Sequence, residues 1–251
     1  MLNIVIPMAG AGSRFAVAGY KDPKPLIPIH GVPMIRLIIE NLKPSGDHKF
    51  IFICQKAHVK EYNLREKLWE WAPGCEILEL DGLTKGAACT VLKAKNLIDS
   101  DFPLMIANSD QYVDIAIDDY LEAISKNDLD GLIMTMTTTD PKWSFVKLSS
   151  KNLVLDVVEK KAISNEATVG IYNYRHGRDF VTAAEKMIES NQSVNGEFYV
   201  APAYNLMIQR NKKIGIFNIG AEGAGMYGLG IPSDLDLFLK LPLSLNATRI
   251  K

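Results

Sequence analysis

The stretch that most constrains this chain is a small-residue loop directly after its first apolar run. Residues 2–6 are short, apolar and rich in branched side chains, which predicts a buried parallel strand. The segment Pro7-Met8-Ala9-Gly10-Ala11-Gly12-Ser13-Arg14 follows. Glycines leave room for a ligand, successive backbone N–H groups can turn toward one anion, and the planar guanidinium of Arg14 suits phosphate. The segment therefore predicts a phosphate-binding loop.

A fixed lysine follows this loop. Lys24 lies between prolines in Lys21-Asp22-Pro23-Lys24-Pro25-Leu26, and prolines favour an extended backbone on either side of it. Loop amides, one arginine and one lysine together suggest capture of a triphosphate. We therefore predict Arg14 and Lys24 as catalytic residues. The loop residues predicted to bind nucleotide are Met8, Ala9, Gly10, Ala11, Gly12, Ser13 and Arg14.

The loop has three other possible interpretations: a dinucleotide-binding loop, a P-loop and a plain turn. A dinucleotide-binding loop requires a third glycine, and Phe15 occupies that position. The P-loop pattern of glycine followed by lysine and serine or threonine is absent. A plain glycine turn between a strand and a helix is the third interpretation. Arg14 and the Lys24 cluster favour the phosphate-binding interpretation over this turn.

Composition narrows the classes of protein that remain. The chain has 251 residues, of which 47% are hydrophobic, so a sizeable core is expected. A formal net charge of −1 argues against nucleic-acid binding. Three cysteines without C-x-x-C spacing indicate free thiols in a reducing compartment. No leader and no apolar run of about 20 residues is seen, so we expect a cytoplasmic protein without a membrane partner.

Apolar runs alternate with amphipathic stretches along the first half of the chain. Strands are predicted at 50–54, 76–80, 103–107 and 131–137, and helices at 33–42, 58–71 and 119–126. Such alternation predicts an α/β fold with a mostly parallel sheet and helices on both faces. Ligands bind at the carboxyl ends of the strands in such sheets, which is where the glycine loop is expected.

The two motifs resemble a known family when they are taken together. The run from Pro7 to Arg14, followed by Lys24-Pro25-Leu26 and Gly31-Val32-Pro33-Met34, is similar to the signature of the sugar-phosphate nucleotidyltransferases. The resemblance implies a Rossmann-like, GT-A-like fold with a smaller mixed β region that binds the acceptor. It implies a single domain over 1–251, with a nucleotide-binding part at 1–140 and an acceptor-binding part and closing segment at 141–251.

The resemblance also implies roles for residues after two later strands. Thr84, Lys85 and Gly86 correspond to a turn that holds the nucleobase and phosphates. Asn108 and Ser109 are expected to contact nucleotide, and Asp110 is the expected metal ligand. Mg²⁺ favours one or two carboxylates together with phosphate oxygens, so Mg²⁺ is the expected cofactor. A helix cap or turn is the simpler alternative for Asn108–Asp110.

Acceptor-binding residues are implied for the second half of the chain. The family motif V-x-E-K is matched at Val157-Val158-Glu159-Lys160 and G-x-Y at Gly170-Ile171-Tyr172, and Glu197 and Tyr199 follow later. Lys160 is the expected contact to the acceptor phosphate. A solvated strand end is the alternative for Glu159 and Lys160.

One stretch departs from the family pattern. Many relatives carry W-x-D-x-G-T-P-x-D, whereas this chain has Gly228 in place of the second metal aspartate and Ile231 in place of the threonine. The second metal ligand is therefore open. Asp234 is predicted to be a helix cap.

The predicted function is Mg²⁺-dependent transfer of a nucleoside monophosphate from a triphosphate to a phosphorylated small molecule, with release of pyrophosphate. Similarity to members of capsular polysaccharide pathways, carried by 142–145 and 195–202, favours CMP transfer and phosphoglutamine or a sugar 1-phosphate as acceptor. A nucleotide-binding sensor and a nucleotide-sugar glycosyltransferase are the alternatives. The latter normally uses a D-x-D motif, and Asn108 replaces its first aspartate. The oligomeric state is left open.

Overall fold

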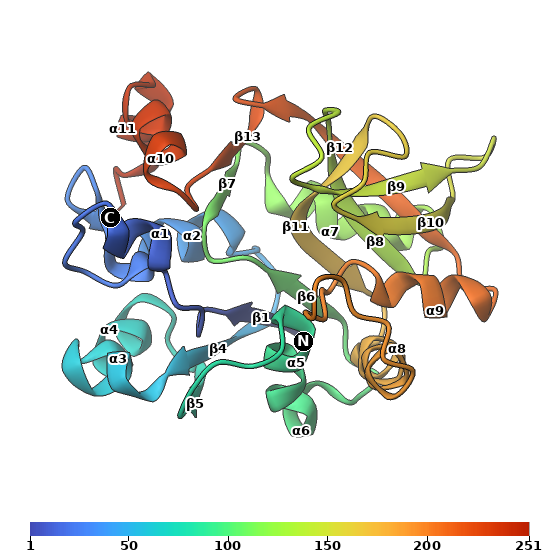
Figure 1. Cartoon of the computed structure of the whole chain (residues 1–251), viewed down its shortest axis with the longest axis horizontal. Helices are drawn as coiled ribbons and strands as arrows, with labels where there is room; N and C mark the ends of the chain where they lie inside the picture. The colour runs from blue at the N-terminus through green and yellow to red at the C-terminus, as the bar shows by residue number, and fades with distance from the viewer. Residues whose placement is uncertain (251) are drawn as a thin grey trace.

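A parallel half-sheet forms around the first strand. The computed structural model describes residues 1–250, and strand β1 (Leu2–Pro7) lies between β4 (His48–Gln55) and β6 (Leu104–Ala107). Strand β5 (Glu76–Leu80) pairs with β4, and all of these pairings are parallel (Figure 1). The carboxyl ends of the four strands therefore lie along one edge, as the α/β prediction requires.

The second half of the same sheet is mixed. Strand β11 (Glu166–Tyr174) runs antiparallel between β6 and β8 (Gly131–Thr137). Beyond β8 come β12 (Ile214–Glu222), β13 (Gly225–Gly228) and β7 (Gln111–Val113). Strands β9 (Ser144–Leu148) and β10 (Val154–Glu159) form a hairpin attached to β11, and β2 (Pro28–Ile29) and β3 (Val32–Pro33) form a separate small pair.

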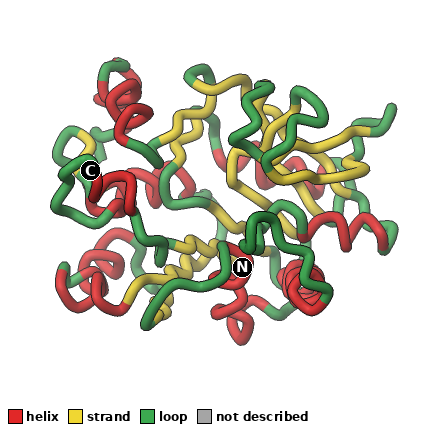
Figure 2. The backbone as a smooth tube through the Cα atoms, viewed as in Figure 1, coloured by secondary structure: helices red, strands yellow, loops and turns green. Residues whose placement is uncertain are grey.

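Helices cover both faces of the sheet, as Figures 1 and 2 show. Ile4 and Ile6 belong to one buried cluster and Val5 to another, because alternate residues of β1 point to opposite faces. The first cluster contains buried residues of α1 (Ser13–Val17), α2 (Met34–Leu42), α3 (Lys56–Glu61), α4 (Leu64–Trp71), α7 (Ile117–Lys126) and α10 (Pro232–Leu239); the second contains those of α5 (Ala87–Val91), α6 (Lys95–Ile98), α8 (Gly177–Glu189) and α9 (Ala203–Gln209).

Three short elements complete the chain. The 3-10 turns η1 (Lys24–Leu26) and η2 (Leu92–Ala94) connect larger elements, and α11 (Pro242–Ala247) follows α10. Across residues 1–250, no helix combines the length and apolar character that a membrane crossing requires. The predicted α/β class, with its mostly parallel sheet and smaller mixed region, is confirmed.

Three local predictions were wrong. Lys24 begins the 3-10 turn η1 and does not lie in the expected extended segment, because the φ that Pro25 imposes also suits a helical turn. The helix expected over 58–71 is two helices, α3 and α4, because Asn63 has a left-handed backbone (φ 48°) that a right-handed helix cannot contain. Asp234 does not cap α10. Ile231 holds the capping position, and Asp234 lies in the first helical turn without a capping hydrogen bond. Its acidic side chain is still favourable near the helix N-terminus.

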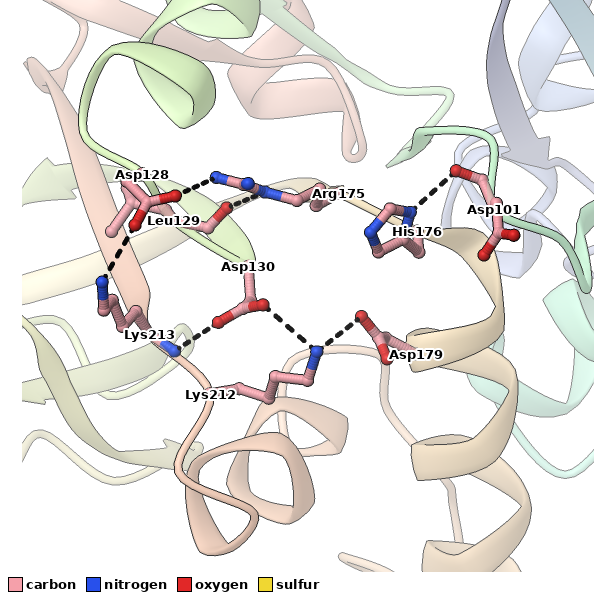
Figure 3. A network of polar contacts seen from close by, with 9 residues as sticks. All are labelled: Asp101, Asp128, Leu129, Asp130, Arg175, His176, Asp179, Lys212 and Lys213. Atoms are coloured by element: carbon pink, nitrogen blue, oxygen red, sulfur yellow. Dashed lines mark hydrogen bonds and ion pairs between the residues drawn. The ribbon is translucent and has the colours of Figure 1, made fainter.

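Figure 3 shows a network of charged side chains beside the ends of β8, β11 and β12. This edge of the sheet is opposite to the one at which the glycine loop follows β1. The Asp130 carboxylate accepts bonds from the Lys213 backbone N–H at 2.8 Å and from Lys212 Nζ at 3.1 Å. Asp128 pairs with Lys213 Nζ at 3.0 Å and with Arg175 at 3.1 Å. Because these residues flank the ends of β8, β11 and β12, the network fixes where three neighbouring strands begin or end.

The network has a defined pH dependence. Hydrogen bonds and charge from Lys213 and Arg175 lower the pKa of Asp128. Burial alone would raise the pKa of Asp130, but the Lys213 N–H and the Lys212 ammonium outweigh that effect and lower it. Carboxyl groups with a lowered folded-state pKa stabilise the fold above their ordinary pKa of about 3.9 and lose this contribution as pH falls through the folded value.

We predict that an Asp128→Asn/Asp130→Asn variant is less stable than the wild type at pH 7, because the substitutions remove the charges whose interactions with Lys212, Lys213 and Arg175 lower the two pKa values in the folded state. Its deficit should shrink as pH falls below about 4, because the wild type then loses the same contribution. Thermal unfolding across this pH range measures the difference. Asp236→Asn, which alters an exposed carboxylate on α10, is the control. A deficit that is constant with pH would contradict the assigned role of charge.

Candidate active site

A cavity of about 430 Å³ opens beside the carboxyl end of β6 and the middle of β11. The hairpin β9–β10 and the segment 197–200 form its other side. Nine of the predicted site residues line it: Arg14, Asn108, Asp110, Glu159, Lys160, Gly170, Tyr172, Glu197 and Tyr199. The fold thus brings together residues from five predicted segments that are far apart in sequence.

The glycine loop leads from β1 toward this cavity. Gln55, at the end of β4, donates hydrogen bonds to the carbonyl oxygens of Ala9 and Gly10, each at 3.0 Å. Gly10, Ala11 and Ser13 are exposed, with Gly12 half-buried before α1. The exposed amides of this loop are therefore accessible to an anion next to Arg14.

The side chains of two loop residues are buried in the core. Met8 and Ala9 are each only 5% exposed, and the Met8 N–H donates to the Ile53 carbonyl at 2.9 Å. Their side chains therefore shape the base of the loop, and any ligand contact from them is through backbone atoms.

Lys24 and Asp110 form an ion pair across the opening of the site. Lys24 Nζ lies 2.8 Å from the Asp110 carboxylate, and the two side chains are 23% and 20% exposed. The turn η1 presents Lys24, while Asp110 follows β6 at the edge where the parallel strands end. The two residues predicted separately as phosphate and metal ligands are therefore in direct contact.

The oxygen donors at this edge suit a hard cation. Asn108 and Gln111 line the same cavity wall as Asp110, and Asn108 Nδ2 donates to Gln111 Oε1 at 3.4 Å. Mg²⁺ favours carboxylate oxygens completed by phosphate and water. Residues 1–250 contain no cluster of three or more histidine, cysteine, aspartate or glutamate side chains arranged for a metal.

Gly228 and Asp234 lie together beside this edge. A Cβ atom on Gly228 would lie 3.2 Å from the Asp234 carboxylate, so Asp234 occupies the space next to the missing side chain. Burial raises the pKa of Asp234, opposed by the positive charges of Lys142 and Arg14. Asp234 is thus a further carboxylate in reach of the basic residues, although not the helix cap that its sequence suggested.

A bulge in β11 joins the nucleotide and acceptor sides. The register of β11 against β8 shifts between Thr168 and Tyr172, and Gly170 (φ +81°) lies within this shift. A Cβ atom on Gly170 would lie 2.2 Å from Asn108 Nδ2, so the close contact requires glycine. The Asn108 N–H donates to the Gly170 carbonyl at 3.0 Å, and Ser109 is buried beside it.

The predicted base-binding turn lies at a neighbouring hollow. Thr84 and Lys85 line a cavity of about 520 Å³ that also reaches Phe198. The Thr84 hydroxyl donates to the Gly86 carbonyl at 3.0 Å. The Phe198 backbone packs against Gly86 at the position where a side chain would be. The glycine is therefore needed for this contact within the protein, whether or not a ligand also binds there.

Lys160, Tyr199 and Glu197, three of the predicted acceptor residues, form a chain of hydrogen bonds. Lys160 Nζ donates to the Tyr199 hydroxyl at 2.6 Å, and that hydroxyl donates to the Glu197 carboxylate. The Tyr199 hydrogen bond raises the pKa of Lys160, and burial followed by the Glu197 hydrogen bond raises that of Tyr199. Lys160 also has a left-handed backbone (φ 53°), a strained conformation that is common at functional sites.

A second polar chain lies deeper in the same wall. Ser144 donates its hydroxyl hydrogen to Glu159, and burial raises the pKa of that carboxyl group despite this bond. Tyr172 and Thr168 share a hydrogen bond of 3.0 Å, and burial raises the pKa of Tyr172. These groups give the cavity hydrogen-bonding partners suited to a hydroxyl-, amide- or amine-bearing molecule.

Several residues of the cavity were not among the predicted site residues. Gln111, Ser144 and Thr168 line the wall, together with Ala87, Lys142, Trp143 and Val200. Ser144 and Thr168 enter the site because β9 pairs with β11 over Ala167, a long-range contact. Only the pairing of these strands, which the separate motifs do not specify, could have identified them.

Comparison with known proteins places this site in a family. Residues 4–205 match the nucleotidyl transferase family, and the chain belongs to it. It is 26% identical over 221 residues to the "Bifunctional protein GlmU" of Methanococcus maripaludis and 27% identical over 221 residues to that of Methanocaldococcus jannaschii. In each case the match covers 86% of this chain and 49% of the relative, so the chain spans about half the length of these relatives.

Solved structures share the fold. A nucleoside-diphosphate-sugar pyrophosphorylase from Vibrio cholerae is 28% identical with a TM-score of 0.80, over 95% of this chain and 100% of that one. The inositol-1-phosphate CTP transferase of T. maritima is 14% identical with a TM-score of 0.76, over 98% and 96% of the two chains. The second likeness concerns the fold alone.

Proposed function

We propose that this protein transfers a nucleoside monophosphate from a nucleoside triphosphate to a phosphorylated acceptor and releases pyrophosphate. The observation that carries the proposal is the placement of Arg14 and the Lys24–Asp110 pair on one side of a cavity that has Lys160 on the other. In this proposal residues 1–140 provide the nucleotide-binding part and 141–251 the acceptor-binding part and closing segment. Family membership and the GlmU and pyrophosphorylase relatives support this chemistry.

The proposed reaction needs positioning more than acid–base chemistry. An acceptor phosphate oxygen attacks the α-phosphorus, a new P–O bond forms, and the bond to the bridging oxygen breaks as pyrophosphate leaves. The attacking phosphate is already ionised at neutral pH. In this mechanism Arg14 and Lys24 stabilise charge on the triphosphate and Lys160 holds the acceptor phosphate. The other nucleotide contacts come from the 8–13 loop, Thr84, Lys85, Gly86, Asn108 and Ser109.

We assign Asp110 as the protein ligand for Mg²⁺. When bound, the ion would supply neutralisation of triphosphate charge. Lys24 now balances Asp110, so a cation that approaches this carboxylate without nucleotide must compete with the ammonium group. With triphosphate present, Lys24 has phosphate oxygens as alternative partners. Metal binding should therefore depend on nucleotide.

For substrates we propose CTP with phosphoglutamine, which corresponds to the CTP:phosphoglutamine cytidylyltransferase of capsular phosphoramidate biosynthesis. Support comes from the 142–145 and 195–202 runs and from two carboxyl groups, Glu159 and Glu197, that could accept hydrogen bonds from an amine or amide. Gly170, Tyr172 and Tyr199 complete the proposed acceptor contacts. Sugar 1-phosphates are the competing acceptors, because the relatives' names include sugar nucleotide enzymes.

The proposal predicts pyrophosphate release only when triphosphate, Mg²⁺ and acceptor are all present. CTP, UTP, ATP and dTTP would each be mixed with phosphoglutamine, glucose 1-phosphate or N-acetylglucosamine 1-phosphate, and released pyrophosphate measured by a coupled assay. We expect the highest rate with CTP and phosphoglutamine. Turnover with a different pair would contradict the proposed substrates but not the proposed reaction. Tight triphosphate binding without turnover for any pair would instead favour a nucleotide sensor.

Lys160→Ala should chiefly weaken acceptor use. Loss of one charged hydrogen bond to phosphate costs roughly 1.5–3 kcal/mol, or about ten- to hundred-fold in acceptor KM. Nucleotide affinity, measured by calorimetry without acceptor, should barely change, because Lys160 contacts the acceptor wall. Lys161→Ala removes the neighbouring exposed lysine and is the matched control. A large loss of nucleotide affinity in Lys160→Ala would assign the lysine to the other substrate.

Asp110→Asn should abolish most turnover and weaken the Mg²⁺ dependence with little change in folding. The substitution keeps size but removes the charge that binds a hard cation. Titration of Mn²⁺, followed by its electron spin resonance signal with and without α,β-methylene-CTP, should show tight binding only to the wild type with nucleotide. Asp236→Asn is the control, and Asp234→Asn shows whether the carboxylate beside Gly228 shares the ion. Full activity of Asp110→Asn would exclude the assignment.

A further inference from the structure

The predicted nucleotide turn and the acceptor wall are joined by a backbone contact. The Phe198 N–H donates to the Lys85 carbonyl at 2.8 Å, and the Ala88 N–H donates to the Phe198 carbonyl at 3.0 Å. Both peptide groups of one residue are thus bonded to the turn at 84–88. The Phe198 side chain is 5% exposed and packs in the core, which holds this contact in place.

Gly86 makes this close approach feasible. The Gly86 backbone φ is +110°, which residues other than glycine rarely adopt. An added Cβ would lie 2.5 Å from the Phe198 carbonyl oxygen and 2.6 Å from the Phe198 backbone nitrogen. The Gly86 carbonyl in turn accepts hydrogen bonds from the Thr84 hydroxyl at 3.0 Å and from the Thr90 N–H at 3.1 Å. Gly86 is therefore fixed from one side by α5 and from the other by Phe198.

The residues on either side of Phe198 belong to the acceptor wall. Glu197 and Tyr199 flank it in sequence, and their side chains form the chain of hydrogen bonds that holds Lys160. On the other side of Glu197, reciprocal Val194–Glu197 backbone bonds of 2.9 and 3.0 Å close a tight turn. Asn195 and Gly196, both with positive φ, form its tip. The acceptor segment is therefore short and stiff, and it can move little without moving the Phe198 contact.

We propose that Gly86 is a positioning residue that couples the two substrates: through Phe198, an occupied nucleotide turn holds Glu197 and Tyr199, and through them Lys160, in the arrangement that binds acceptor. This inference rests on the proposed function. It adds that the two substrates bind with positive coupling, because ordering of the turn by nucleotide reduces the cost of ordering the acceptor segment.

The first test uses the wild-type protein. Hydrogen–deuterium exchange is measured for peptides covering 194–199, alone and with saturating α,β-methylene-CTP or α,β-methylene-UTP, without acceptor. We expect exchange at this segment to slow by about threefold or more, although the segment's side chains line the acceptor wall. Unchanged exchange, with nucleotide binding confirmed by calorimetry, would overturn the coupling alone. Absence of any nucleotide binding would overturn the proposed function and the coupling with it.

The second test is a double-mutant cycle on acceptor KM. Gly86→Ala displaces the Phe198 backbone, and Tyr199→Phe removes the hydroxyl that joins Lys160 to Glu197. Each should raise KM for phosphoglutamine, or for the sugar 1-phosphate that supports turnover, by about tenfold. Because Gly86 is itself a proposed nucleotide contact, the acceptor KM of each variant is measured at saturating nucleotide. The double variant should be no worse than the worse single variant, because the glycine acts through the tyrosine.

Gly82→Ala is the matched control for strain. Gly82 lies in the same connection with φ +157°, but an added Cβ would meet no atom within 4 Å. Its substitution should leave the acceptor KM within about twofold of the wild type. Multiplicative effects in the double variant, or an equal rise in Gly82→Ala, would show that Gly86 acts through general strain and not through Phe198.

Discussion

The placement of β6 between β1 and β11 is the constraint on which the rest of the site depends. Parallel pairing with β1 puts the end of β6 beside the glycine loop, so Asp110 meets Lys24. Antiparallel pairing with β11 puts Ile171 opposite Ala107, so Gly170 and Tyr172 reach the same edge. One strand therefore sets the relation between the two sides of the cavity, and its four residues are all buried.

The bulge in β11 converts this pairing into a usable site. The register shift lies in the pairing of β11 with β8, and Gly170 within it packs against the Asn108 side chain, where any Cβ atom would collide. Thr168 and Tyr172, on either side of the shift, share a hydrogen bond in the cavity wall. The residues at the shift are thus those at which the strand lines the cavity, while the regular ends of β11 pair with β8 in the core.

Much of the architecture could be predicted from local patterns. The strand at 131–137 is predictable because it is a continuous apolar run with turn residues on either side. The loop around Gly10 is predictable because its glycines and other small residues favour a loop. Asn63 was missed because a left-handed residue leaves no break in helical periodicity. Asp234 was misassigned because a cap depends on backbone angles that composition does not show.

The site was predictable to the extent that its residues lie in contiguous motifs. The clusters at 8–14, 108–110 and 157–160 were each visible, but nothing in them shows that Lys24 pairs with Asp110 or that Tyr199 receives a hydrogen bond from Lys160. Thr168 lies in no motif, and Ser144 belongs only to the 142–145 run, which assigns it no role in the site. Such contacts depend on strand order and register, which arise from packing over the whole sheet and not from neighbouring residues.

The charges at the two ends of the cavity are arranged in similar ways. Lys24 is held by Asp110, and Lys160 by Tyr199 and, through it, Glu197. Each lysine thus has a hydrogen-bonding partner before any phosphate arrives, and each has an acidic group that offsets its charge. Lys24 is partly buried, whereas Lys160 is exposed. A phosphate at either end would meet an ammonium group whose side chain is already ordered, so less conformational entropy remains to be lost on binding. Because the Phe198 contact joins the acceptor segment to the 84–88 turn, ordering at one end is connected to ordering at the other by backbone hydrogen bonds and not by side chains alone.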